Sequence, residues 1–311
     1  MTAPALTVTF LGTGSGAPSL ERNLASVAVQ RQGDLFLFDC GEAAQIQYRR
    51  AALGFAGLSA IFISHMHGDH VTGLMGLLMS LQMADRVEPL QVYGPPGLSG
   101  YVHACRRHLQ TRFSFPLSIS ESSGAGCVLE TDAYRVTTEP LDHRMFCLGY
   151  RFEEHSRPGR FDVKRARALE VPSGPLFGAL QHGNSVELPD GRVIRPQDVL
   201  GPARPGASFA YCTDTRPCPG AVTLAQNVDL LIHEGTFEAG REDEARRKGH
   251  STVADAARAA QLSGARQLVV THLSPRYQDP SVLAAQARAI FPNTRIARDL
   301  MRVEIQHRET E

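Results

Sequence analysis

The sequence comprises 311 residues, of which 42% are hydrophobic and 21% are charged, and its 32 Lys and Arg balance 32 Asp and Glu. A chain of this length can bury most of the surface that its unfolded form exposes, so core volume is not limiting. The zero formal net charge disfavours a protein that binds polyanions over its whole surface, and any nucleic-acid contact must use a local patch. Its six cysteines include no C-x-x-C pair, so neither a disulfide framework nor a structural zinc knuckle is indicated.

No segment of the sequence suggests a membrane protein. The longest apolar stretches, such as Leu74 to Met83, fall well short of the roughly 20 residues that span a bilayer. The residues Met1 to Phe10 lead into a strand-like segment and lack the basic, apolar and cleavage regions of a leader peptide. We therefore expect a cytoplasmic protein without a membrane partner.

Short apolar runs alternate with helical patterns along most of the chain. The runs predict strands at Leu6–Leu11, Ser26–Val29, Leu35–Asp39, Ala60–Ser64, Leu90–Val92, Tyr134–Thr138, Ser208–Cys212, Asp229–Ile232 and Gln267–Thr271. Apolar residues at three-to-four spacing predict helices at Ala43–Leu53, Val71–Ala84, Gly97–Leu109, Thr252–Leu262 and Ser281–Ile290. This alternation predicts an α/β fold with mixed sheets.

One segment, from about His155 to Arg204, interrupts the alternation. It is rich in Gly, Pro and Arg and shows no strong period, which indicates an inserted excursion. Its first part is locally basic, with Asp162 as the only acid among Arg157, Arg160, Lys164, Arg165 and Arg167. A solvated loop is one explanation of this charge run, and a binding surface is the other.

The loop that follows the strand Ala60–Ser64 is dense in metal-binding side chains. Within six residues it contains His65, His67, Asp69 and His70. Imidazole nitrogens and carboxylate oxygens suit zinc, and also manganese or iron, while Gly68 permits the tight backbone path that lets neighbouring ligands converge. A surface loop that merely happens to be rich in histidine would not be expected between an apolar strand and an apolar helix. Four donors in one loop suggest two metals.

Other predicted strands also end in ligand-type residues, namely His143, Asp214, His233 and His272. Taken singly, such a residue is more often a cap or a satisfied polar group. Because the strand ends of an α/β fold form the crevice where sites assemble, we expect several of them to join the histidine loop. The hypothesis assigns His65, His67 and His143 to one metal and Asp69, His70 and His272 to the other. Asp214 would bridge the two.

The spacing His-x-His-x-Asp-His at residues 65 to 70 resembles the signature of the metallo-β-lactamase superfamily. Further motifs narrow the likeness to the ribonuclease Z family and cover nearly the whole chain: Phe10 to Pro18 with Arg22 and Asn23, Phe38 to Glu42, His233 to Phe237, His250 to Thr252, and Thr271 to Tyr277. Two residues depart from that family's usual pattern. Thr213 replaces the Gly before the bridging aspartate, and Gly235 replaces the Ala of a His-Glu-Ala-Thr motif.

The resemblance implies a metallo-β-lactamase-like αββα sandwich of two mixed sheets with outer helices. Residues 1–311 would form one catalytic domain, and residues 151–206 an inserted flexible arm that grips tRNA. The implied activity is a zinc-dependent endoribonuclease that hydrolyses the phosphodiester 3′ of the discriminator base of precursor tRNA. It would hold two zinc ions per subunit, with manganese or iron as alternatives, and form a homodimer in which one subunit's arm serves the other subunit's site. Alternative functions are a small-molecule phosphodiesterase or exoribonuclease of the same fold, or a diiron oxidoreductase.

The resemblance also implies catalytic roles. Two metals would lower the pKa of a shared water and clamp the phosphate, and Asp69 matches the family's acceptor of the water's proton. His250 is our candidate donor to the leaving 3′ oxygen, because it directly precedes a capped helix start, where a phosphate is favoured. Glu234 would orient its ring. The alternative is that His250 only packs ahead of the helix cap.

Overall fold

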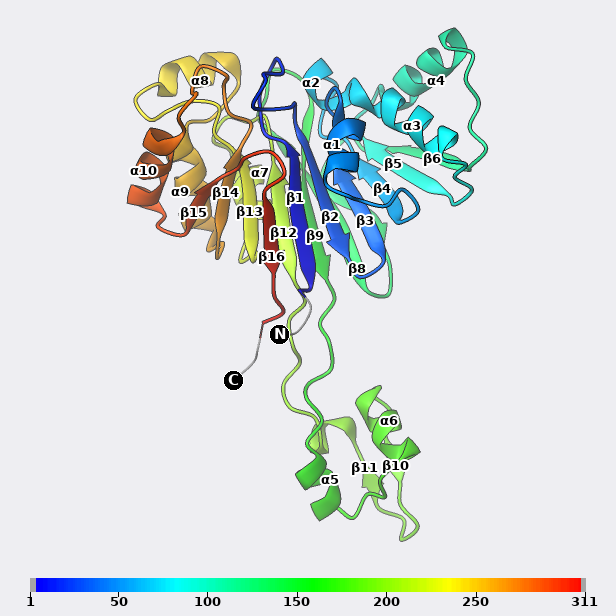
Figure 1. The fold of residues 1–311 in the computed structure, drawn as a ribbon. Coiled ribbons are helices and arrows are strands. Elements are labelled where there is room, and N and C mark those ends of the chain that lie inside the picture. The colour runs from blue at the N-terminus through cyan, green and yellow to red at the C-terminus, as the bar shows by residue number, and fades with distance from the viewer. Residues whose placement is uncertain (1–3, 309–311) are drawn as a thin grey trace. The chain divides into compact units, whose positions relative to one another are not determined.

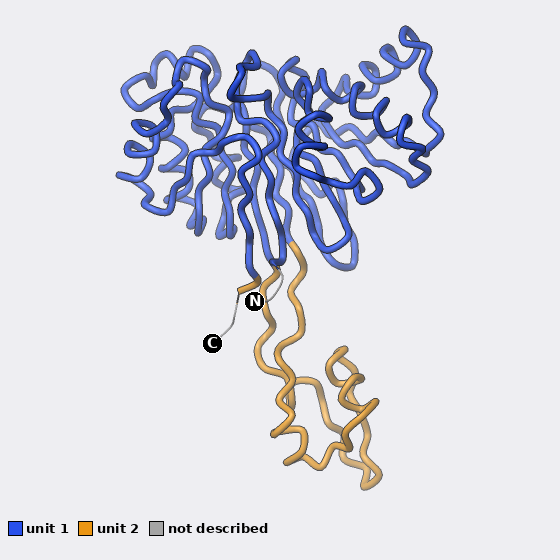
Figure 2. The backbone as a smooth tube through the Cα atoms, in the orientation of Figure 1, with its two compact units in different colours: residues 1–153, 207–306 blue, residues 154–206, 307–311 orange. Residues whose placement is uncertain are grey.

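A computed structural model of the protein describes residues 4–308. The chain forms two compact units, shown in different colours in Figure 2. The larger unit runs to Glu153 and resumes from Ala207 to Gln306. The smaller unit comprises Glu154 to Gly206 together with His307 and the residue after it. Within residues 4–308, no helix is long and apolar enough to cross a membrane.

The first sheet of the larger unit contains seven strands in the order β16-β1-β2-β3-β4-β5-β6. The bounds are β16 (Arg302–Ile305), β1 (Leu6–Gly12), β2 (Ser26–Arg31), β3 (Asp34–Phe38), β4 (Leu58–Phe62), β5 (Leu90–Gly94) and β6 (Leu117–Glu121). The strands from β16 to β3 pair antiparallel, whereas those from β3 to β6 pair parallel. The sheet is therefore mixed.

The second sheet also contains seven strands, in the order β15-β14-β13-β12-β9-β8-β7. The bounds are β15 (Thr294–Ile296), β14 (Leu268–Thr271), β13 (Leu230–Glu234), β12 (Ser208–Cys212), β9 (Cys147–Glu154), β8 (Tyr134–Leu141) and β7 (Gly126–Glu130). The strands β12 to β15 are parallel, and β9 runs antiparallel to β12. The carboxyl ends of β12, β13 and β14 therefore meet at one edge of the sheet.

Helices cover the outer faces of both sheets (Figure 1). On the first sheet they are α1 (Ala44–Arg50), α2 (Gly68–Val71), α3 (Gly73–Met83) and α4 (Leu98–His108), and on the second α7 (Pro219–Leu224), α8 (Glu242–Lys248), α9 (Val253–Ser263) and α10 (Ser281–Ile290). An aromatic core that includes Phe36, Phe62, Tyr150 and Phe209 fills the space between the sheets. Each sheet packs a second apolar cluster against its helices. Burial on both faces explains why most strands are apolar runs. The predicted αββα sandwich of two mixed sheets is confirmed.

The structure adds several elements to those predicted from sequence. The predicted helix Val71–Ala84 corresponds mainly to α3, and the separate one-turn helix α2 precedes it across Thr72. The strands β6 and β7 were not predicted, because their side chains are largely exposed or half-buried and they lack a clear apolar run. Strands β9, β15 and β16 were also missed.

The smaller unit has secondary structure and an apolar core of its own. It contains α5 (Val163–Ala168), α6 (Pro175–Gln181), the hairpin β10 (Val186–Glu187) to β11 (Val193–Ile194), and a 3₁₀ turn at Pro196–Asp198. Its buried side chains are Ala166, Val171, Leu180, Val186, Leu188, Ile194 and Val199. Helices of six and seven residues make fewer than two turns, which is too short to show a period in the sequence. The segment is therefore folded rather than an irregular loop.

Candidate metal centre

The histidine loop begins where β4 ends. Phe62 is the last residue of β4, and the buried Ile63 and Ser64 bring the chain to His65. His65 and His70 are completely buried, and His67 stands directly before the short helix α2. The apolar strand thus delivers polar side chains into the interior, where they require partners.

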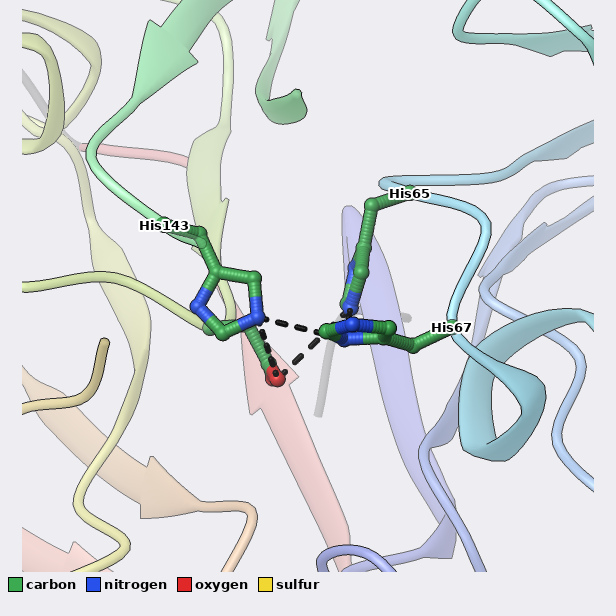
Figure 3. Close-up of side chains that lie close together, drawn as sticks. His65, His67 and His143 are labelled. Atoms are coloured by element: carbon green, nitrogen blue, oxygen red, sulfur yellow. Dashed lines mark hydrogen bonds and ion pairs between the residues drawn. The ribbon is translucent and has the colours of Figure 1, made fainter. Parts of the chain in front are cut away.

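The structure brings all the predicted ligands into two neighbouring groups. The first contains His65, His67, His143 and Asp214, and the second contains Asp69, His70 and His272. In the first, Nδ1 of His67 lies 3.0 Å from Nε2 of His65 and 3.2 Å from Nε2 of His143. Figure 3 shows these three rings turned toward one another, with His65 and His67 on one loop and His143 on a separate segment. In the second, the Nε2 atoms of His70 and His272 are 3.2 Å apart.

Asp214 lies between the two groups and presents one carboxylate oxygen to each. Its Oδ2 is 3.6 Å from Nε2 of His65 and 3.7 Å from Nε2 of His143. Its Oδ1 is 3.3 Å from Nε2 of His70 and 3.1 Å from Nε2 of His272. Asp214 and His272 both have positive φ, 37° and 56°. Residues other than glycine hold this backbone conformation when the surrounding structure enforces it. The backbone turns after β12 and β14 thus aim both side chains into the site.

Hydrogen bonds on the far side of the His143, His65 and His272 rings fix which nitrogen faces the groups. Nδ1 of His143 donates to the carbonyl of Gly249 at 2.7 Å, so its Nε2 carries the free electron pair. Nδ1 of His65 lies 2.9 Å from the Ser64 hydroxyl, and Nδ1 of His272 lies 3.0 Å from the Thr236 hydroxyl. Such outer partners orient metal-binding histidines in proteins generally.

Asp39 is the outer partner of His70 and was not predicted from sequence. Its Oδ2 is 2.7 Å from Nδ1 of His70 and accepts hydrogen bonds from the hydroxyls of Ser64 and Tyr211, each at 2.8 Å. Its Oδ1 accepts from the Ser64 amide at 2.7 Å. The signal in the sequence is a carboxylate directly after the apolar strand β3. Its partners lie far away in the sequence, so only the fold reveals the role.

The protonation of the first group favours cation binding. Burial lowers the pKa of His65, His67 and His143, so these rings are held neutral. Burial would raise the pKa of Asp214, but the surrounding histidines outweigh it and hold that pKa well below its usual range. Neutral imidazoles and an ionised carboxylate offer electron pairs to a cation, because no proton occupies the donor atoms. In the second group burial favours a neutral His70, but the Asp214 and Asp39 carboxylates outweigh it and raise the pKa of that ring, so a cation there must displace a proton. The donor set fits two divalent cations.

Asp69 lies at the edge of the second group and reaches the surface. Its Oδ2 lies 3.5 Å from Nε2 of His272 and accepts a hydrogen bond from the amide of Gly16 at 2.8 Å. Gly16 has φ of 72°, a conformation that favours glycine and turns its amide toward the carboxylate. Both residues line an open cavity of about 430 Å³ that also includes Asp214, His250 and Arg276. A substrate can therefore reach the two candidate metal-binding groups from this cavity.

Comparison with known proteins identifies the family. The chain is 46% identical to a protein from Salinibacter ruber named Ribonuclease Z, over 97% of this chain and 95% of that one. The identity to a protein of the same name from a Cyanothece strain is also 46%, over 98% and 97% of the two chains. The chain belongs to the ribonuclease Z family.

Structural and profile comparisons agree with this assignment. The crystal structure of the short form of human tRNase Z has a TM-score of 0.68 and 26% identity, and the match covers 96% of this chain and 99% of that one. Residues 175–273 match the profile described as Beta-lactamase superfamily domain. Residues 6–106 match the profile of Anti-Pycsar protein Apyc1.

The structure gives a physical account of both departures from the ribonuclease Z pattern. The hydroxyl of Thr213 donates to Oδ1 of Asp214 at 2.9 Å, which adds a bond that a glycine could not make. At Gly235, an added Cβ would lie 2.3 Å from Cγ1 of Val270 and 2.9 Å from Cγ1 of Val253. The tight packing of these valines requires glycine at this position.

His250 and Glu234 are paired, as the sequence hypothesis required for the proton donor and its orienting group. Nδ1 of His250 lies 2.8 Å from Oε1 of Glu234. Glu234 is completely buried, and its Oε2 accepts hydrogen bonds from the amide and hydroxyl of Thr236. Burial favours the neutral ring, but the Glu234 carboxylate outweighs it and raises the pKa of His250 to about 9. His233 stands outside the metal-binding groups, and its Nδ1 donates to the carbonyl of Glu234 at 2.7 Å.

Proposed function

We propose that the protein is a metal-dependent endoribonuclease that removes the 3′ trailer from precursor tRNA. The observation that carries the proposal is Asp214, whose two oxygens face two groups of histidines beside an open cavity. Membership of the ribonuclease Z family supplies the substrate class. A site with room for two cations suits a phosphodiester, because two metals can act on the attacking and the leaving oxygen.

Two zinc ions per subunit are the proposed cofactors. One would be held by His65, His67, His143 and Asp214, and the other by Asp69, His70, His272 and Asp214. The predominance of imidazole nitrogen favours zinc over magnesium or calcium, which prefer oxygen ligands. When bound, the pair supplies a water that is acidic enough to ionise at neutral pH and a positive field for the phosphate.

Asp69 is the proposed first acceptor of the proton from the attacking water. Burial would raise its pKa, but the neighbouring His272 and His70 outweigh it and lower the pKa below its usual range, so the carboxylate is ionised. The Gly16 amide holds Oδ2 at 2.8 Å and thereby fixes the carboxylate at the mouth of the cavity. Asp69 can then orient the water for attack on phosphorus.

His250 is the proposed proton donor to the leaving 3′ oxygen. The ring lines the cavity and, with a pKa of about 9, carries a proton at neutral pH. Glu234 holds the ring at Nδ1 and stabilises its charged form. Two residues after His250, the N-cap Thr252 starts α9, with its hydroxyl accepting from the amide of Asp255. The cap anchors the segment that carries His250.

The smaller unit is the proposed tRNA-binding arm, inserted in a single catalytic domain. Its apolar core gives it a defined surface, and its first part carries the basic run that begins at Arg157. We further propose a homodimer, in which the arm serves the tRNA held by the partner, and a cytoplasmic location. Removal of residues 157–204 tests the arm, because β9 and β12 pair up to Glu153 and Ser208 and a short turn can join them. This variant should bind precursor tRNA more weakly yet hydrolyse bis(p-nitrophenyl) phosphate. Equal loss on both substrates would argue against the arm's role.

The decisive experiment maps the products of a precursor tRNA that bears a 3′ trailer, after incubation with the protein or with Asp69→Ala, in the presence of zinc or manganese. We expect a cut directly after the discriminator base by the unchanged protein and none by the variant. Stepwise shortening of the trailer would instead show an exoribonuclease. Hydrolysis of bis(p-nitrophenyl) phosphate without RNA cleavage would favour a small-molecule phosphodiesterase.

A further inference from the structure

Two cations at the rim of the cavity have no part in the proposed chemistry. Lys248 and Arg276 line the same cavity as Asp69 and His250. Both lie over the ring of Phe237, with Nζ of Lys248 at 5.6 Å and Cζ of Arg276 at 5.1 Å from its centroid. The ring is only 2% exposed, so it forms a fixed support rather than a mobile surface group. Attraction to the ring helps hold both charges in place.

Glu244 connects the same two cations. Its Oε1 lies 3.1 Å from Nη2 of Arg276 and 3.2 Å from Nζ of Lys248. Its Oε2 lies 3.0 Å from Nη1 of Arg241, which also pairs with Glu238 at 2.7 Å. Hydrogen bonds, first of all from Arg276, outweigh desolvation and lower the pKa of Glu244 to about 2, so this carboxylate is ionised.

The arrangement leaves positive charge beside the cavity. Arg241 has Glu238 as a second acid, whereas Lys248 and Arg276 share Glu244. Their side chains are 53% and 36% exposed, so each can exchange water for a ligand without a large desolvation cost. A planar guanidinium and a compact ammonium on one support are suited to a phosphate group.

We propose that Lys248 and Arg276 bind the RNA phosphate next to the scissile one, with Phe237 and Glu244 as positioning residues. The inference rests on the proposed ribonuclease function. The scissile phosphate occupies the metal-binding groups, and an RNA strand carries its next phosphate to the rim of the same cavity. This contact would select a polynucleotide over a substrate with a single phosphodiester.

The test compares Arg276→Gln and Lys248→Gln with Arg241→Gln, the matched control. Arg241 shares the Glu244 carboxylate but does not belong to the described residues that line the cavity. For each substituted cavity residue, kcat/KM on precursor tRNA should fall about tenfold, mainly through KM, as expected for the loss of one charge-assisted hydrogen bond. The loss on bis(p-nitrophenyl) phosphate should be much smaller. Arg241→Gln should match the unchanged protein on both substrates.

Salt dependence separates a phosphate contact from a structural effect. The slope of log kcat/KM against log salt should become shallower by about 0.7 in each cavity variant, because one fewer phosphate is neutralised. Methylphosphonate replacement of single phosphates on either side of the cut locates the contact. At the contacted position, the methylphosphonate should lower kcat/KM of the unchanged protein about tenfold. In Arg276→Gln the contact is already lost, so the same replacement should lower kcat/KM only slightly further.

Full additivity of the methylphosphonate and Arg276→Gln losses at every position would overturn the inference. The inference would also be overturned if Arg276→Gln and Lys248→Gln had the same salt slope and KM as Arg241→Gln. In both cases the unchanged protein still cuts the precursor, so the proposed function stands. Absence of cleavage by the unchanged protein would overturn the proposed function and this inference together.

Discussion

Gly235→Ala should destabilise the protein, although alanine is the usual residue of the family's motif. Gly235 directly follows β13, and an added Cβ would meet Cγ1 of Val270 on β14 at 2.3 Å. Ordinary contacts of a Cβ lie at 3.4 to 4 Å, so β14 or the valine must move by about 1 Å. Both valines that face the position are completely buried, which leaves little room for such a movement.

The magnitude follows from two opposing effects. Overpacking of a well-packed core costs about 2 kcal/mol. Alanine also reduces the backbone freedom of the unfolded chain, which stabilises the folded protein by about 0.7 kcal/mol, because alanine can adopt the conformation of Gly235. We expect a net loss of about 1 to 2 kcal/mol in the free energy of unfolding. Val270→Ala removes the closer of the two clashes, so the double variant should lose less than the sum of the single variants, by about 1 kcal/mol.

Urea unfolding followed by circular dichroism measures these differences, since the chain has no Trp to report by fluorescence. Gly100→Ala is the matched control, because its Cβ would meet nothing within 4 Å in the helix α4. This control should be at least as stable as the unchanged protein. A Gly235→Ala variant as stable as the control, or strict additivity with Val270→Ala, would refute the packing argument.

Three further predictions concern the metal centre. Thr213→Val removes the hydroxyl that donates to Asp214 at 2.9 Å, and should weaken metal retention about tenfold in competition with a chelator. Asp39→Asn replaces the anionic partner of His70 and should weaken metal retention by about 10- to 100-fold. If either variant lost its metal at the same chelator concentration as the unchanged protein, the role of Thr213 or Asp39 as an outer partner would be contradicted. His250→Ala should lower kcat while both metals stay bound. Because the raised pKa keeps His250 protonated below about 9, kcat of the unchanged protein should fall as pH rises through that value, and the variant should lack this decline.

Local patterns in the sequence were sufficient for an α/β fold with mixed sheets and for the identity of the candidate ligands, whereas the αββα sandwich was predicted from the family resemblance. Apolar runs between helical periods indicate strands that are covered on both faces, and such strands end at one edge of a sheet. The dense loop from His65 to His70 and the strand-end residues His143, Asp214 and His272 were therefore recognisable before any coordinates. Edge strands such as β6 were not predicted, because exposed strands lack an apolar run. The core of the smaller unit was not predicted either, because its helices are too short to show a helical period in the sequence.

Only the tertiary structure decided how these residues act on one another. The division of the Asp214 oxygens between two histidine groups, the role of Asp39 behind His70 and the pairing of Glu244 with Arg276 all join residues from separate elements. The Asp39 and Tyr211 pair, for example, is separated by 172 positions in the chain. Sequence patterns report the local conformation and burial of each element, but hydrogen bonds and charge pairs depend on which elements pack together, and that is set by the core.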